Sequence, residues 1–94
     1  MALNTFSKIS VLPQVSTSRV RELQWGMTWF EKEYREAKAN EDLAWKLYDD
    51  AIENGDPIEE KNAIYIACKL FEAARIEAYH NWQECKRQYL ELMN

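Results

Sequence analysis

This sequence has one place where a glycine and a proline, the residues that most often end helices, lie close together. That place divides the chain into two long stretches. The break is Asn54-Gly55-Asp56-Pro57. Gly55 suits the left-handed residue after a helix end, and Pro57 is tolerated in a first helical turn. Asp56 can cap the second helix, with Glu59 as its capping-box partner. The sequence therefore predicts a tight turn at 54–57 between one helix at about 19–54 and another at about 58–93.

Apolar residues on both sides of the break recur in steps of three and four, the heptad spacing of helices that pack side by side. The first row is Val20, Leu23, Met27, Phe30, Tyr34, Ala37, Glu41, Ala44, Tyr48 and Ala51. The second row is Ile64, Ala67, Phe71, Ala74, Ala78, Trp82, Cys85, Tyr89 and Leu92. Val20 and Leu92 are equidistant from Asp56, as are Tyr48 and Ile64, so the rows face each other if the chain folds back there. We therefore predict an all-α fold, an antiparallel helical hairpin of two long helices, each about 54 Å long at ~1.5 Å per residue.

The first 18 residues differ from the rest of the chain. They contain no acidic residue, and they mix apolar and polar positions around Pro13. The hydroxyls of Ser16, Thr17 and Ser18 can cap the exposed amides of a helix start. We expect an extended N-terminal arm at 1–18 and a helical-hairpin domain at 19–94.

Many large apolar residues lie outside the two facing rows. They are Trp25, Trp29, Leu43, Trp45, Leu47, Ile52, Ile66, Leu70, Ala73 and Ile76. A two-helix hairpin has no third layer to cover them, so they indicate a partner. We predict a homo-oligomer in which the arm packs on its own or a neighbouring hairpin. The alternative is a monomer whose arm folds over the spare apolar face.

Net charge and hydropathy restrict the classes of partner. The 94 residues include 12 Lys and Arg against 16 Asp and Glu, a formal charge of −4. This balance disfavours polymeric nucleic acid and anionic membranes as partners. The first residues also lack the basic start and long apolar stretch of a signal peptide. We expect a soluble, cytoplasmic protein without a membrane segment.

The charges separate along the predicted hairpin. Folding back brings Arg19 and Arg21 beside Lys86 and Arg87, and Lys8 lies in the arm next to them. Free amides and hydroxyls at a helix start suit a phosphate, and aromatic rings there could stack on a base. The predicted ligand-binding residues are Phe6, Lys8, Ser16, Thr17, Ser18, Arg19, Arg21 and Trp25. In the alternative interpretation, Arg19 and Arg21 pair with Glu22 or a neighbour's Glu91, and the hydroxyls only cap.

Other reactive residues do not form a recognisable active site. Cys68 and Cys85 are 17 residues apart on one helix, roughly 25 Å, too far for a disulfide. His80 reads as an interface residue, and no Cys/His spacing predicts zinc. Glu41, the one acid in the facing rows, should reach Lys38 or Lys69 or fix the register. We expect no catalytic residue, no metal and no cofactor.

The chain resembles a known family in its overall plan and in one local stretch. The plan is a short arm, an STSRVRELQW start and two long helices with one tight turn, and the stretch is LPQVSTSRVRELQWGMTWF, Leu12–Phe30. Both resemble the helical-hairpin phage sponges, the anti-CBASS proteins and the hairpin region of anti-Thoeris proteins. The resemblance carries over no individual ligand contact.

The resemblance implies a phage protein that acts in the host cell cytoplasm and sequesters cyclic nucleotide messengers without cleaving them. It also implies a hexamer of interlocked hairpins, with cyclic dinucleotides held between protomers and cyclic trinucleotides in separate pockets. Two other functions stay open on the sequence. One is an acidic helical inhibitor of a host protein, and the other is a phage assembly chaperone.

Overall fold

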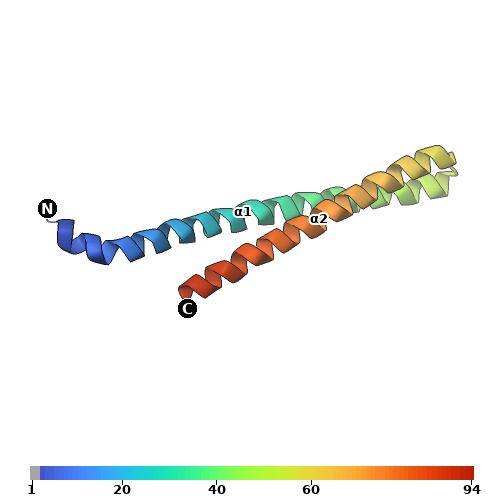
Figure 1. The fold of residues 1–94 in the computed structure, drawn as a ribbon. Coiled ribbons are helices and arrows are strands. Elements are labelled where there is room, and N and C mark those ends of the chain that lie inside the picture. The colour runs from blue at the N-terminus through green and yellow to red at the C-terminus, as the bar shows by residue number, and fades with distance from the viewer. Residues whose placement is uncertain (1–2) are drawn as a thin grey trace.

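The protein folds as a helical hairpin. The computed structural model describes the backbone of residues 3–94 and the side chains of residues 18–94. Two helices, α1 (Leu3–Asn54) and α2 (Ile58–Met93), run antiparallel along an elongated body with principal extents of 76 × 23 × 14 Å (Figure 1). The described residues form no strand. The predicted all-helical hairpin is therefore confirmed.

The turn between the helices follows the predicted glycine signal. The Gly55 N–H donates to the Ile52 carbonyl at 3.1 Å, and the Asp56 N–H donates to the Ala51 carbonyl at 2.9 Å. These two bonds satisfy the last carbonyls of α1 in the Schellman pattern, which needs a left-handed residue, and Gly55 has φ +69°.

The expected cap by Asp56 is wrong. Pro57 occupies the N-cap position of α2, and no side-chain hydrogen bond caps this helix. Two glutamates in the first turn, Glu59 and Glu60, instead place negative charge near the positive end of the helix dipole.

The start of the first helix differs from the prediction. α1 begins at Leu3, so the backbone of 3–18 is helical and not an extended arm with a helix start near Arg19. The segment contains no glycine, and Pro13 is its only residue without an N–H, which leaves the other amides able to continue the helical ladder. With 52 residues against 36, α1 extends past the end of α2 (Figure 1).

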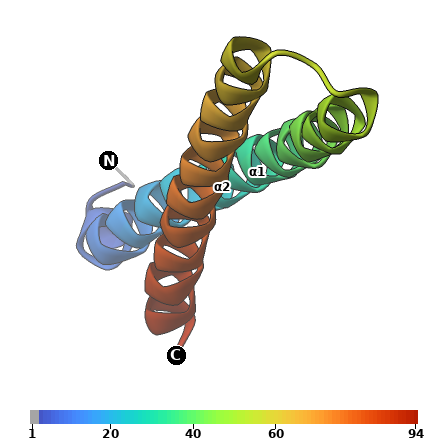
Figure 2. The same ribbon diagram turned by 90° about the vertical axis from the view of Figure 1, so that its right-hand side faces the viewer.

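The contact between the helices is thin and built mainly from small residues. Its buried apolar residues are Leu23, Ala37, Ala44, Ala51, Cys68 and Ala78. Gly26 is also buried, and a Cβ placed there would lie 2.9 Å from the Cys85 Sγ. Such small side chains let the helix axes approach closely, and α2 crosses over α1 (Figure 2). The residues of the two predicted rows, except the exposed Ala74 and Leu92, are buried or half-buried, and the contact between the helices also includes Gly26 and Cys68.

Two aromatic clusters fill the contact on either side of its middle. Tyr34 packs against Tyr79 and Trp82 with ring centroids 5.6 and 5.7 Å away. Toward the turn, Trp45, Tyr48 and Tyr65 pack with all three centroid distances at 5.8 Å. Trp45 is therefore half-buried within the hairpin and does not belong to the spare apolar surface, contrary to the prediction.

The other apolar residues outside the rows remain exposed, as predicted. The strongest cases are Trp25 at 69%, Leu70 at 66%, Ile66 at 59%, Leu43 at 57% and Leu47 at 50% exposure. Neither helix, over its described residues, has a window long and apolar enough to cross a membrane. The hairpin alone leaves apolar surface on the outer sides of both helices.

Candidate functional site

The eight predicted ligand-binding residues fall into two groups. The side chains of Phe6, Lys8, Ser16 and Thr17 lie outside the described side chains, although their backbone belongs to α1. Ser18, Arg19, Arg21 and Trp25 are described, and all four are exposed. Because α1 continues back to Leu3, the amides near Arg19 lie inside a helix. The expected helix start near residue 19 is therefore wrong, and phosphate binding by the predicted residues stays a prediction without that support.

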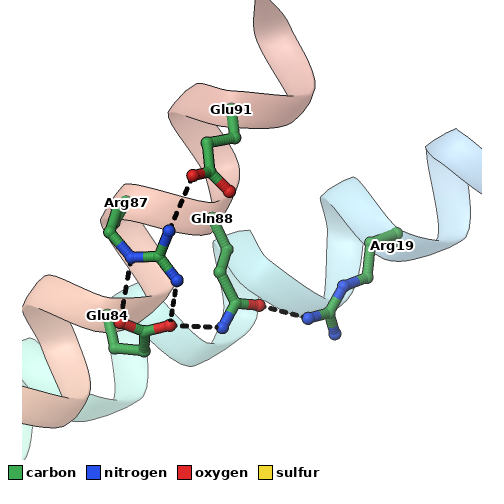
Figure 3. Close-up of polar contacts among 5 residues, drawn as sticks. All are labelled: Arg19, Glu84, Arg87, Gln88 and Glu91. Atoms are coloured by element: carbon green, nitrogen blue, oxygen red, sulfur yellow. Dashed lines mark hydrogen bonds and ion pairs between the residues drawn. The ribbon is translucent and has the colours of Figure 1, made fainter.

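Arg19 is occupied by neighbours within the hairpin. Its guanidinium pairs with Glu22 at 2.8 Å. It also donates to the Gln88 side-chain oxygen across the interhelical contact (Figure 3). The Arg19–Glu22 pair of the alternative interpretation is confirmed, whereas its pairing of Arg21 and its capping by the hydroxyls stay predictions. Arg19 consequently links the two helices at their open end.

The arginine near the end of α2 is also neutralised. Arg87 donates to Glu84 at 2.5 Å and to Glu91 at 2.6 Å, and Gln88 donates to Glu84 at 2.7 Å (Figure 3). The hydrogen bonds from Arg87 and then Gln88 lower the pKa of Glu84 to about 2. Glu91 thus pairs with Arg87 of its own chain. Among the described side chains of the open end, Arg19 and Arg87 are thus paired with carboxylates, so this end is not a uniform basic patch.

A row of exposed aromatic and basic side chains lies farther along α1. Trp25 and Trp29 are stacked, with ring centroids 5.7 Å apart and planes 12° from parallel. The Lys32 Nζ lies 5.9 Å from the centroid of the Trp29 ring, within cation–π range. Arg21, one turn before Trp25, is exposed as well. We call Arg21, Trp25, Trp29 and Lys32 the outer strip.

The helical repeat explains why these four residues lie together. Steps of four, four and three residues keep side chains on one side of a helix, here the side away from the interhelical contact. The strip runs for about 16 Å at ~1.5 Å per residue. Trp29 and Lys32 were missed as site residues, although their spacing from Trp25 could have revealed them. The sequence predicted Trp29 only as one of the apolar residues outside the facing rows.

The outer strip combines two kinds of recognition. The exposed indole faces can stack on a planar ring, which is worth about 1–3 kcal/mol per nucleobase. The cations at both ends can contact anionic groups, and Lys32 is only loosely held by Glu36 at 3.9 Å. Ser18 is exposed one turn before Arg21 and belongs to the same side of α1. This arrangement suits a flat aromatic ligand that carries negative charge.

A separate buried ion pair lies in the middle of the interhelical contact. Glu41, 7% exposed, accepts a 2.5 Å hydrogen bond from the Arg75 Nε. This bond lowers the pKa of the Glu41 carboxyl against the opposing effect of burial. The predicted partners are wrong, because Lys38 pairs with Asp42 and Lys69 with Glu72. Glu41 therefore joins the two helices and is turned away from solvent.

The remaining reactive residues add no further centre among the described side chains. Cys68 is a buried free thiol and Cys85 a half-buried one, and burial raises the pKa of the Cys68 thiol. The described residues contain no group of three or more His, Cys, Asp or Glu placed to hold a metal ion. His80 packs edge-on against Tyr79, with centroids 6.1 Å apart.

The chain matches no protein-family model, and searches of curated proteins and of solved structures find no significant match.

Proposed function

We propose that this protein binds cyclic oligonucleotide messengers and sequesters them without cleavage. In this function it is a phage-encoded inhibitor of bacterial CBASS immunity that acts in the host cytoplasm. The observation that carries the proposal is the outer strip, in which two stacked and exposed tryptophans lie between two basic residues. Arg21, Trp25 and Trp29 also fall within Leu12–Phe30, the stretch that resembles the sponge family.

The proposal includes assembly of several copies. A convex helix face touches only one side of a ligand, so a second copy is needed to enclose a nucleotide. The exposed apolar residues on the outer sides of both helices, Leu43 and Leu47 on α1 and Ile66 and Leu70 on α2, offer surface for that contact. We propose a homo-oligomer, and the family resemblance makes it a hexamer. Cyclic dinucleotides would then lie between protomers and cyclic trinucleotides in separate pockets.

Calorimetry with cyclic GMP–AMP and with cyclic oligoadenylates tests the binding. We expect saturable binding by the wild type, and an affinity lowered about tenfold to a hundredfold in Trp25→Ala, because one stacking face is lost. Ile58→Ala is the matched control, since Ile58 is 64% exposed but lies beside the turn, outside the strip and outside the residues proposed for assembly. An absence of heat at micromolar protein would remove the sponge function. An equal loss in Ile58→Ala would remove the strip as its site.

Recovery of the ligand separates sequestration from catalysis. The bound cyclic nucleotide is released by heat denaturation and identified by mass spectrometry. We expect the intact cyclic compound. A linear or shortened product would replace the sponge function with an enzymatic one.

The exposed apolar rows also favour a second candidate, an inhibitor that docks one helix in a groove of a host protein. Light scattering separates the two candidates. A monomer that binds no cyclic nucleotide, and that forms a complex with one purified host protein, would support this second function. A ligand-binding oligomer would exclude it.

A further inference from the structure

A groove between the two helices lies near the open end of the hairpin, apart from the outer strip. It has a volume of about 520 Å³ and none of its lining residues belongs to the outer strip. Its apolar surface comes from Met27 on α1 and from Trp82 and Leu90 on α2. Leu90 is 50% exposed, so apolar surface at the groove is in contact with water. The volume lies within the range of about 300–1,000 Å³ that is usual for small-molecule sites.

Four polar groups besides one carboxylate line this groove, and each of them can donate a hydrogen bond. The Lys86 ammonium only donates, whereas the Gln24 amide and the hydroxyls of Thr28 and Tyr89 both donate and accept. No ion pair of Lys86 occurs among the side chains of residues 18–94. The groove therefore offers one positive charge beside an apolar surface.

The single carboxylate of the groove is already neutralised. Glu31 accepts two hydrogen bonds from Arg35, at 3.0 Å from Nε and 2.6 Å from Nη2. Lys86 consequently sets the sign of the charge that the groove can recognise. A ligand with one negative group satisfies the charge of Lys86, whereas a second negative group would find no other cation among the residues that line the groove.

We propose that this groove binds an organic anion that has one carboxylate or sulfonate group on an apolar body, such as a medium-chain fatty acid. The head group accepts hydrogen bonds from Lys86, Gln24 and Tyr89. The apolar body covers Met27, Trp82 and Leu90, which removes their exposed surface from water. The site is independent of the outer strip, and it differs from it in preferring a single charge and an aliphatic body.

Calorimetric titration with octanoate tests this site, with 1-octanol as the uncharged analogue of the same length. We expect one saturable site per chain for octanoate. Lys86→Gln should weaken octanoate binding about tenfold because it loses a charge-assisted hydrogen bond, and it should leave the weaker octanol binding unchanged. Lys46→Gln is the matched control, since Lys46 is exposed but lies toward the turn.

The groove assignment has three outcomes that would overturn it. The first is the absence of saturable octanoate binding, and the second is equal affinity in wild type and Lys86→Gln. The third is a fall in molar mass on octanoate addition, which would show that a second copy occupies the groove. Cyclic GMP–AMP should leave octanoate binding intact. Competition between them would contradict an independent site, whereas failure of either ligand alone identifies which proposal is wrong.

Discussion

Replacement of Glu41 by leucine should destabilise the hairpin because it strands a cation in the interhelical contact. Glu41 is 7% exposed, and its carboxylate on α1 accepts a 2.5 Å hydrogen bond from the Arg75 Nε on α2. The Arg75 side chain is 30% exposed, so part of its guanidinium reaches water. After the substitution, Arg75 keeps its charge but loses its partner.

The expected cost follows from this partial burial. A hydrogen bond to a charged group contributes about 1.5–3 kcal/mol, and removal of one partner from a fully buried pair costs about 3–5 kcal/mol. Because Arg75 can turn toward water, we expect Glu41→Leu to lower the free energy of unfolding by about 1–3 kcal/mol. The double variant Glu41→Leu/Arg75→Leu removes both charges and should return to within about 1 kcal/mol of wild type or exceed it.

Urea unfolding followed by far-ultraviolet circular dichroism measures these differences. All variants are compared at one protein concentration, because the stability of an oligomer depends on concentration. Arg35→Gln is the control, since it breaks only the exposed Glu31 pair and should change stability by less than about 0.5 kcal/mol. A Glu41→Leu variant as stable as wild type, or a double variant as unstable as the single one, would refute the reasoning.

Two further predictions concern acid stability and the closest helix approach. Hydrogen bonds from arginines lower the pKa of two carboxyls in the folded protein, that of Glu84 to about 2 through Arg87 and that of Glu41 through Arg75. Both carboxylates therefore stabilise the folded state at pH values above their usual pKa of 4.5. Stability should therefore fall as the pH drops from about 4.5 toward 2, and Glu84→Gln should reduce this dependence in pH-dependent thermal melts; an unchanged slope would contradict it. Gly26→Ala should destabilise the wild type by about 1–2 kcal/mol, since its Cβ would lie 2.9 Å from the Cys85 Sγ. In a Cys85→Ala background the same change should stabilise by about 1 kcal/mol through helix propensity, and an equal effect in both backgrounds by urea unfolding would rule out the clash.

The candidate site shows how far local spacing can be followed. The position of Trp25 on an exposed helix face, with Arg21 one turn before it, could be predicted because both residues belong to one helix. The stacked arrangement with Trp29 and the cation–π contact of Lys32 depend on side-chain rotamers, although four- and three-residue spacings make them possible. By contrast, the occupation of Arg19 by Gln88 depends on a residue 69 positions away.

The sequence alone determined the hairpin, because its signals are local and repeat. A glycine with positive φ ends α1, and heptad rows on both sides of it fix which faces meet. Tertiary structure decided the partner of Glu41. Lys38 and Lys69, the nearest cations by register, are taken by Asp42 and Glu72 on their own helices. The Arg75 side chain, one turn farther along α2 than Glu72, reaches across the contact to Glu41. Several carboxylates lie near each of these cations, and the distances in the folded structure decide which of them form a pair. Spacing along the chain does not contain those distances.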